Sequence, residues 1–275
     1  MEITPRNWYN TILLIIQEDT AVTLAAKPNQ IKLLVGSAGI LGLALRAVLY
    51  TNGVDRKGLL ISGYWAGSAI WCLTAVVALV LLLRCHRLNS TQDYGKAFPA
   101  SALGAAGSAL AGIAFLLSPV AQTPSQTIGT IEPALRYASA GALIFISYCR
   151  FRGKAPQFLL HSTVCLYLAL RLVCQYRLWS ADPQIQNYAF YLGAHVALML
   201  TAYQFAAFDA GFGSHQKLWG AGLAGIYLAT VSLVPAKEPF FLICCVLWIA
   251  TNLSRPQTVK DSTPTENHPN QEDLP

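Results

Sequence analysis

Charged side chains are scarce in this chain. Asp, Glu, Lys and Arg make up 12% of its 275 residues, against roughly 25% in typical globular domains. Hydrophobic residues make up 54%. Between residues 31 and 253 no polar stretch is long enough to form a separate soluble core. The composition therefore excludes an ordinary soluble domain and predicts one integral membrane domain.

Recognisable metal and thiol motifs are also lacking. The chain has seven cysteines but no CxxC pair, and its five histidines are scattered without HExxH spacing. Five of the cysteines lie within apolar runs, where a thiol behaves as a small apolar side chain. We therefore expect no metal site, no cofactor and no nucleic acid partner, and the lipid bilayer is the expected surrounding.

Long apolar runs are what the chain does have. A helix that spans a bilayer needs about 20 predominantly apolar residues, and strands of a barrel would alternate in polarity. The sequence predicts an all-α polytopic membrane helix bundle over residues 31–253, with about eight transmembrane helices. They are expected at 31–51, 64–83, 98–120, 133–148, 156–175, 188–208, 218–234 and 239–253. The fourth run is short and polar at its start.

The distribution of Lys and Arg predicts the orientation, because these residues accumulate in short loops on the cytoplasmic side. With the N-terminus inside, twelve of the 19 Lys and Arg residues fall on the cytoplasmic face. An even number of spans then places both termini in the cytoplasm of a multi-pass cell-membrane protein. If segment 133–148 does not span, Arg150, Arg152 and Lys154 fall outside, against the rule.

The two ends differ from the bundle in composition. Residues 1–30 lack the basic start, uninterrupted apolar run and small-residue cleavage site of a signal peptide, so we expect none. Apolar side chains between Trp8 and Ile16 predict a short interfacial amphipathic helix, with a loose hydrophobic arm as the alternative. Residues 254–275 are too polar to bury a core and predict a disordered cytoplasmic tail.

Small residues form a stripe in the third run. Gly104, Ser108 and Gly112 are spaced by four and share one helical face, which permits close approach of another helix. We expect this face either at the centre of the bundle or at a homo-oligomer contact.

A remote alternative for the same serine is hydrolysis within the membrane. Ser108 in a glycine-rich helix, with His195 in the sixth run, is similar to the arrangement of a rhomboid-type intramembrane serine protease. The small residues around Ser108 are in a different order, however, and an upstream His and Asn pair is missing. The sequence thus favours a function other than catalysis.

Three arginines are the candidate binding residues. Arg46, Arg136 and Arg171 lie inside apolar runs, in the half of the membrane that the orientation makes the outer one, and charge there is costly. His195 lies in the same half, and Glu132 precedes Arg136 by four residues, where the two can pair. The excess of positive charge predicts an anionic ligand. The alternative is that the arginines extend to the interface.

Three stretches of the chain carry a resemblance to a group of uncharacterised multi-pass bacterial membrane proteins. They are GVDRKGLL at 53–60, DYGKAFPAS at 93–101 and YRLWSADPQ at 176–184. The resemblance implies a bacterial plasma membrane and no particular activity. Asp55 and Asp182, in the first and last stretch, are the acids best placed to close over the arginines, with Asp182 as a helix cap the simpler alternative.

Three function classes follow from these observations. A transporter or channel for a small anionic solute would use the arginines as charge complements and Glu132 as a pairing or proton-linked partner. A membrane sensor or assembly subunit would use the same site for recognition, without transport or catalysis. An intramembrane hydrolase would need a nucleophile and base that converge, which the sequence does not show.

Overall fold

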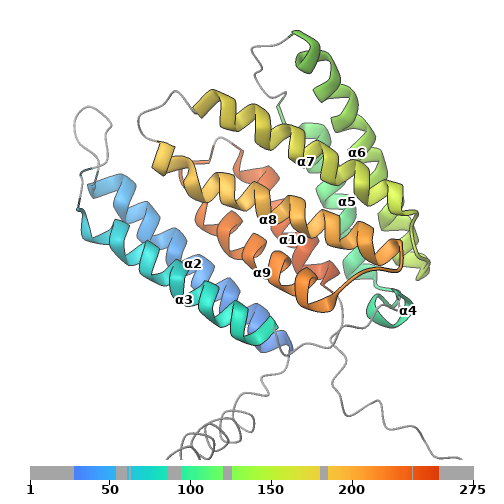
Figure 1. Ribbon diagram of the computed structural model, residues 1–275, viewed down its shortest axis with the longest axis horizontal. Helices are drawn as coiled ribbons and strands as arrows, with labels where there is room; N and C mark the ends of the chain where they lie inside the picture. The colour runs from blue at the N-terminus through green and yellow to red at the C-terminus, as the bar shows by residue number, and fades with distance from the viewer. Residues whose placement is uncertain are drawn as a thin grey trace, which may run out of the picture.

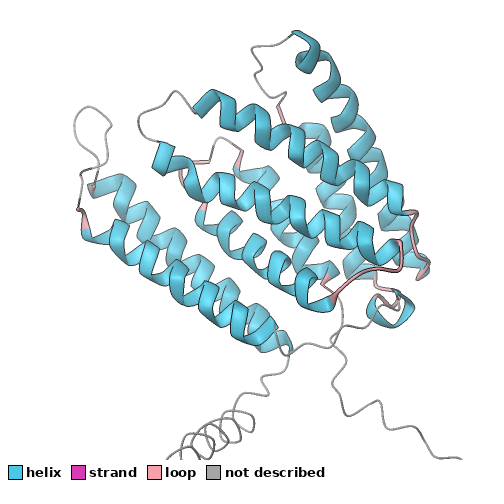
Figure 2. Cartoon of the chain, viewed as in Figure 1, coloured by secondary structure: helices cyan, strands magenta, loops and turns pink. Residues whose placement is uncertain are grey.

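The computed structural model describes residues 28–53, 61, 63–85, 94–119, 126–179, 185–236 and 238–253. Every regular element in these ranges is a helix, as Figure 2 shows, so the predicted all-α class is confirmed. The predicted interfacial helix near the N-terminus and the polar tail lie outside the described residues. The helices are α2 (Pro28–Asn52), α3 (Trp65–Cys85), α4 (Tyr94–Ala97), α5 (Ala102–Leu117), α6 (Gln126–Arg152), α7 (Phe158–Trp179), α8 (Ile185–Asp209), α9 (His215–Val231) and α10 (Pro239–Asn252).

Four helical segments are long and apolar enough to cross a membrane, namely Gln30–Asn52, Trp65–Cys85, Phe158–Arg177 and Tyr188–Asp209. Two shorter apolar helices, α5 and α10, accompany them. Large apolar side chains also cover the outside of the bundle, for example Leu33 in α2 and Leu82 in α3, which are 76% and 72% exposed. Such a surface suits lipid rather than water. The chain is therefore a membrane protein.

Helix α6 is the largest departure from the prediction. It runs for 27 residues, from Gln126 to Arg152, where the sequence predicted a short span at 133–148. At 1.5 Å per residue the helix is about 40 Å long. Pro133, where the sequence predicted this helix to begin, lies inside it. The additional turns carry Glu132 at one end and Arg150 at the other, and both residues are buried.

Helix α5 begins later than predicted. Ser101 caps it, and the Ser101 Oγ accepts a hydrogen bond from the Gly104 backbone N–H at 3.1 Å. Phe98, expected in the span, lies before the helix and packs its ring 5.1 Å from Phe208 and 5.9 Å from Phe205 of α8. The short helix α4 thereby lies across one end of the bundle (Figure 1).

Helices α5 to α10 form the main bundle, and α2 and α3 form a hairpin that packs on α9 (Figure 1). Hydrogen bonds show that α5 and α6 run in opposite directions. The Ser101 N–H donates to Arg150 O, which joins the start of α5 to the end of α6, and Arg136 near the start of α6 donates to Ser118 O after α5. We refer to the first end as the α4 end, and to the other, where α10 begins, as the Glu238 end.

Candidate functional site

Arg171 is the centre of a buried polar cluster at the Glu238 end. It lies near the end of α7 and is 0% exposed. Its Nη1 donates hydrogen bonds to Tyr167 Oη at 2.7 Å and to Ser118 Oγ at 3.2 Å, and its Nη2 forms an ion pair with Glu238. The Phe241 ring centre lies 4.6 Å from its guanidinium carbon. The charge therefore points into the bundle and does not extend to the interface.

Glu238 is the partner that the sequence prediction missed. It immediately precedes α10, which begins with Pro239, and the side chain turns inward to Arg171. Burial raises the pKa of the Glu238 carboxyl above its ordinary value, and the adjacent Arg171 opposes that change. The available signal was an acid directly before the last apolar run, on the side of the membrane that holds the arginines.

Glu132 and Arg136 join this cluster, but not as the pair that their spacing predicted. No ion pair forms between them in the part of the chain that the structure describes. Arg136 donates to Ser118 O and lies over the Tyr137 ring, with 4.9 Å to its centre. Glu132 is 0% exposed, and its Oε1 accepts from the Tyr167 hydroxyl at 3.5 Å. Its Oε2 has no hydrogen-bond partner among the described residues.

We call these residues the Arg171 cluster; its members are Ser118, Glu132, Arg136, Tyr167, Arg171 and Glu238. Two arginines face two carboxylates, so the excess of positive charge predicted from the sequence is absent from this cluster. The Tyr167 hydroxyl accepts from Arg171 and donates to Glu132, which connects the ion pair to the second acid.

His195 lies beside the Arg171 cluster. It is buried in α8, its Nδ1 is 3.0 Å from Tyr191 O, and its ring is stacked 6.0 Å from the Phe241 ring that also covers Arg171. Its Nε2 has no hydrogen-bond partner within the described ranges. The structure therefore brings four of the five predicted site residues together, namely Glu132, Arg136, Arg171 and His195.

Arg46 is the predicted site residue that lies apart. It is buried in α2, and its guanidinium carbon is 5.0 Å from the Phe190 ring centre and 5.7 Å from that of Tyr50. Aromatic faces attract such a cation. The position of Arg46 in an apolar run predicted its burial correctly, but it does not predict which helices pack against α2. Asp55 and Asp182, predicted to close over the arginines, lie outside the described residues.

A second buried polar cluster occupies the α4 end, and the sequence prediction did not name it. We call it the Arg150 cluster; its members are Tyr94, Arg150, His161, Asp209 and Asn252. Arg150 Nε donates to Asn252 Oδ1 at 2.8 Å, and His161 Nδ1 lies 2.5 Å from Asp209 Oδ2. Arg150 was counted as a loop cation because α6 was predicted to end at residue 148. The DYGKAFPAS stretch, which includes Tyr94, was the available signal.

The small-residue stripe of α5 packs inside the bundle. A Cβ at Gly104 would lie 3.0 Å from Asn252 Oδ1, and one at Gly112 would lie 3.1 Å from Ala140 O of α6. Ser108 is buried between them. Gly104, Ser108 and Gly112 therefore face the chain's own helices, as expected for a helix at the centre of the bundle. A homo-oligomer contact stays a prediction.

The hydrolase alternative finds no support in the geometry. Ser108 Oγ donates to Gly104 O at 2.9 Å and accepts from Asn252 Nδ2 at 3.1 Å, near the α4 end. His195 instead binds Tyr191 O, towards the Glu238 end. The two side chains thus have different partners in different parts of the bundle. In the described ranges no three His, Cys, Asp or Glu side chains are grouped as metal ligands would be.

Comparison with known protein families, with curated proteins and with solved structures found no match. The assignment of a function therefore depends on the two clusters.

Proposed function

We propose that this chain is a multi-pass cell-membrane protein that transports a small anionic solute, with the Arg171 cluster as its binding site. The observation that carries the proposal is a buried arginine whose carboxylate partner, Glu238, has a second buried carboxylate, Glu132, connected to it through Tyr167. Buried charges are costly and mark ligand or proton pathways in membrane helices. Glu132 Oε2 without a partner among the described residues adds to that cost.

The site supports transport by exchange of partners. A solute carboxylate takes the place of Glu238 on the Arg171 guanidinium, while the hydroxyls of Tyr167 and Ser118 continue to accept from Arg171 Nη1. The cluster is neutral before the solute enters, with two arginines and two glutamates. A bound monoanion then leaves one uncompensated negative charge, and Glu238, whose pKa burial already raises, takes up one proton. Each monoanion therefore crosses with one proton.

We also propose that the chain crosses the membrane with the topology predicted from the sequence. Eight spans with both termini in the cytoplasm place the Glu238 end outside and the α4 end inside. The solute then enters from the outer side next to His195 and Arg136, and Arg46 on α2 lies at the edge of this end without contact to the solute.

Flux measurements test the proposal. The purified chain in liposomes is given labelled acetate, lactate and succinate while a trapped dye reports internal pH. We expect uptake of at least one probe together with protons. Arg171→Gln should reduce that uptake by about 30-fold or more, since a buried charge pair is lost. Arg177→Gln is the matched control, because Arg177 is exposed on the same helix. No uptake of any probe, or equal uptake by Arg171→Gln, overturns the proposal.

A further inference from the structure

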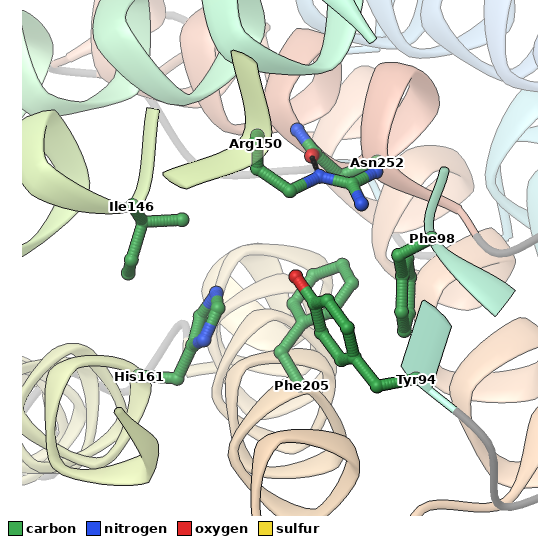
Figure 3. Close-up of a pocket in the computed structure, with 7 residues that line it drawn as sticks. All are labelled: Tyr94, Phe98, Ile146, Arg150, His161, Phe205 and Asn252. Carbon is green, nitrogen blue, oxygen red and sulfur yellow. Dashed lines mark hydrogen bonds between the residues drawn. The ribbon is translucent and has the colours of Figure 1, made fainter. Parts of the chain in front are cut away.

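Four members of the Arg150 cluster, Tyr94, Arg150, His161 and Asn252, line a pocket. Figure 3 shows Arg150 and Asn252 on one side, with Tyr94, His161 and two phenylalanines, Phe98 and Phe205, around the remaining space. The lining residues come from α4, α6, α7, α8 and α10 and from the segment after α4. The free volume is about 10 Å³, roughly what one water molecule needs. A carboxylate or phosphate is too large, so the pocket suits a water molecule or an ion of similar size.

Arg150 brings to this pocket a positive charge that forms no ion pair with a carboxylate among the described residues. It is 6% exposed, and its Nε donates to an amide oxygen, that of Asn252, and not to a carboxylate. The amide cannot turn its nitrogen to Arg150, because Asn252 Nδ2 donates to Gly104 O at 2.9 Å and to Ser108 Oγ at 3.1 Å. The Phe98 ring centre lies 4.9 Å from the guanidinium carbon. These contacts fix the guanidinium, and none of them is with a carboxylate; Asp209 acts on its charge only from a distance.

The nearby acid is engaged elsewhere. Asp209 Oδ2 is bound to His161 Nδ1, and the two side chains are 0% and 5% exposed. No ion pair joins Asp209 to Arg150 in the described part of the chain. Since Nδ1 is used, the His161 ring offers only Nε2 to the pocket, and Figure 3 shows the ring pointing into the space beside Arg150. With Nδ1 bound to Asp209, Nε2 is the ring nitrogen that faces the guanidinium side of the pocket.

Tyr94 supplies a neutral donor. Burial raises the pKa of its hydroxyl to about 12, so the hydroxyl stays protonated at neutral pH. The pocket is thus bordered by a guanidinium, an imidazole nitrogen and a hydroxyl, with aromatic walls between them. Positively charged and neutral donors around a water-sized space match a small anion.

We propose that the pocket between Arg150, His161 and Tyr94 binds one monovalent anion of halide size, with chloride as the physiological form. The anion neutralises Arg150 and holds α4 and the ends of α6, α7 and α10 together. This site is separate from the transported solute, because it is at the opposite end of the bundle and is too small for a carboxylate.

The experiment uses the full chain in detergent, exchanged into gluconate buffer and titrated with sodium chloride at constant ionic strength. We expect saturable broadening of the ³⁵Cl resonance and a rise in the thermal midpoint. Arg150→Gln should weaken chloride binding by about tenfold or more, and Tyr94→Phe, which keeps the ring packing, by about threefold or more. Arg152→Gln, exposed on the same helix, is the matched control and should bind as the wild type does.

Two further outcomes decide the proposal. If Arg150→Gln does not fold, Tyr94→Phe alone provides the decisive comparison. If chloride changes neither the resonance nor the thermal midpoint more than gluconate does, the pocket holds only water. If the chloride effects are unchanged in Tyr94→Phe, the ion binds elsewhere. Either result overturns the proposal. Arg171→Gln should bind chloride normally, so a failure of transport and a failure of this site are distinguished.

Discussion

Two buried arginines at opposite ends of one bundle contact different partners. Arg171 lies against the carboxylate of Glu238, whereas Arg150 lies against the amide of Asn252, and the acid of its cluster, Asp209, binds His161 instead. Both side chains are almost completely buried. A ligand at Arg171 must therefore displace an ion pair, which couples binding to a proton. A ligand at Arg150 needs only to fill a space.

The largest expected effect tests the direct ion pair. Glu238→Gln leaves the Arg171 charge buried without its partner, so the free energy of unfolding should fall by about 3–5 kcal/mol. Adding Arg171→Met should recover much of that loss, because both charges are then gone. Reversible unfolding in mixed micelles measures these values.

Glu132→Gln is the matched comparison within the same cluster. Glu132 accepts one long hydrogen bond of 3.5 Å and has no ion pair among the described residues, so its neutralisation should change the unfolding free energy by less than about 1 kcal/mol. A loss as large as that of Glu238→Gln would show that Glu132 compensates the arginines as strongly as Glu238 does.

The next effect tests the contact that fixes Arg150. A Cβ at Gly104 would lie 3.0 Å from Asn252 Oδ1 and 3.4 Å from Arg150 Nη2, so Gly104→Ala should cost about 1–3 kcal/mol and weaken chloride binding. Gly141→Ala is the control, since nothing lies within 4 Å of a Cβ there. It should stabilise α6 by up to about 1 kcal/mol. Equal effects of the two variants would mean that the Gly104 contact does not position Asn252.

The sequence allowed the fold class to be predicted, together with burial of the arginines and half of the Arg171 cluster, namely Glu132, Arg136 and Arg171. Apolar runs determine helices, and a charge within a run is buried with its helix. Helix ends were harder to predict: α6 continues past both predicted limits, and at the first of them Pro133 lies inside the helix. The partners could not be predicted. Glu238 and Asn252 meet their arginines across distances of 67 and 102 residues, which depend on how helices pack and not on local spacing.

The last prediction concerns Arg46, the predicted site residue that lies outside both clusters. The sequence grouped it with Arg171, but its guanidinium lies over the rings of Phe190 and Tyr50. Arg46→Gln should lower the unfolding free energy by about 0.5–2 kcal/mol, the range of a cation–π contact. Carboxylate uptake and chloride binding should both stay within about twofold of wild type, because the rings that Arg46 contacts, Tyr50 and Phe190, belong to neither cluster. A loss of uptake equal to that of Arg171→Gln would instead return Arg46 to the solute site and require α2 to move towards the Arg171 cluster during transport.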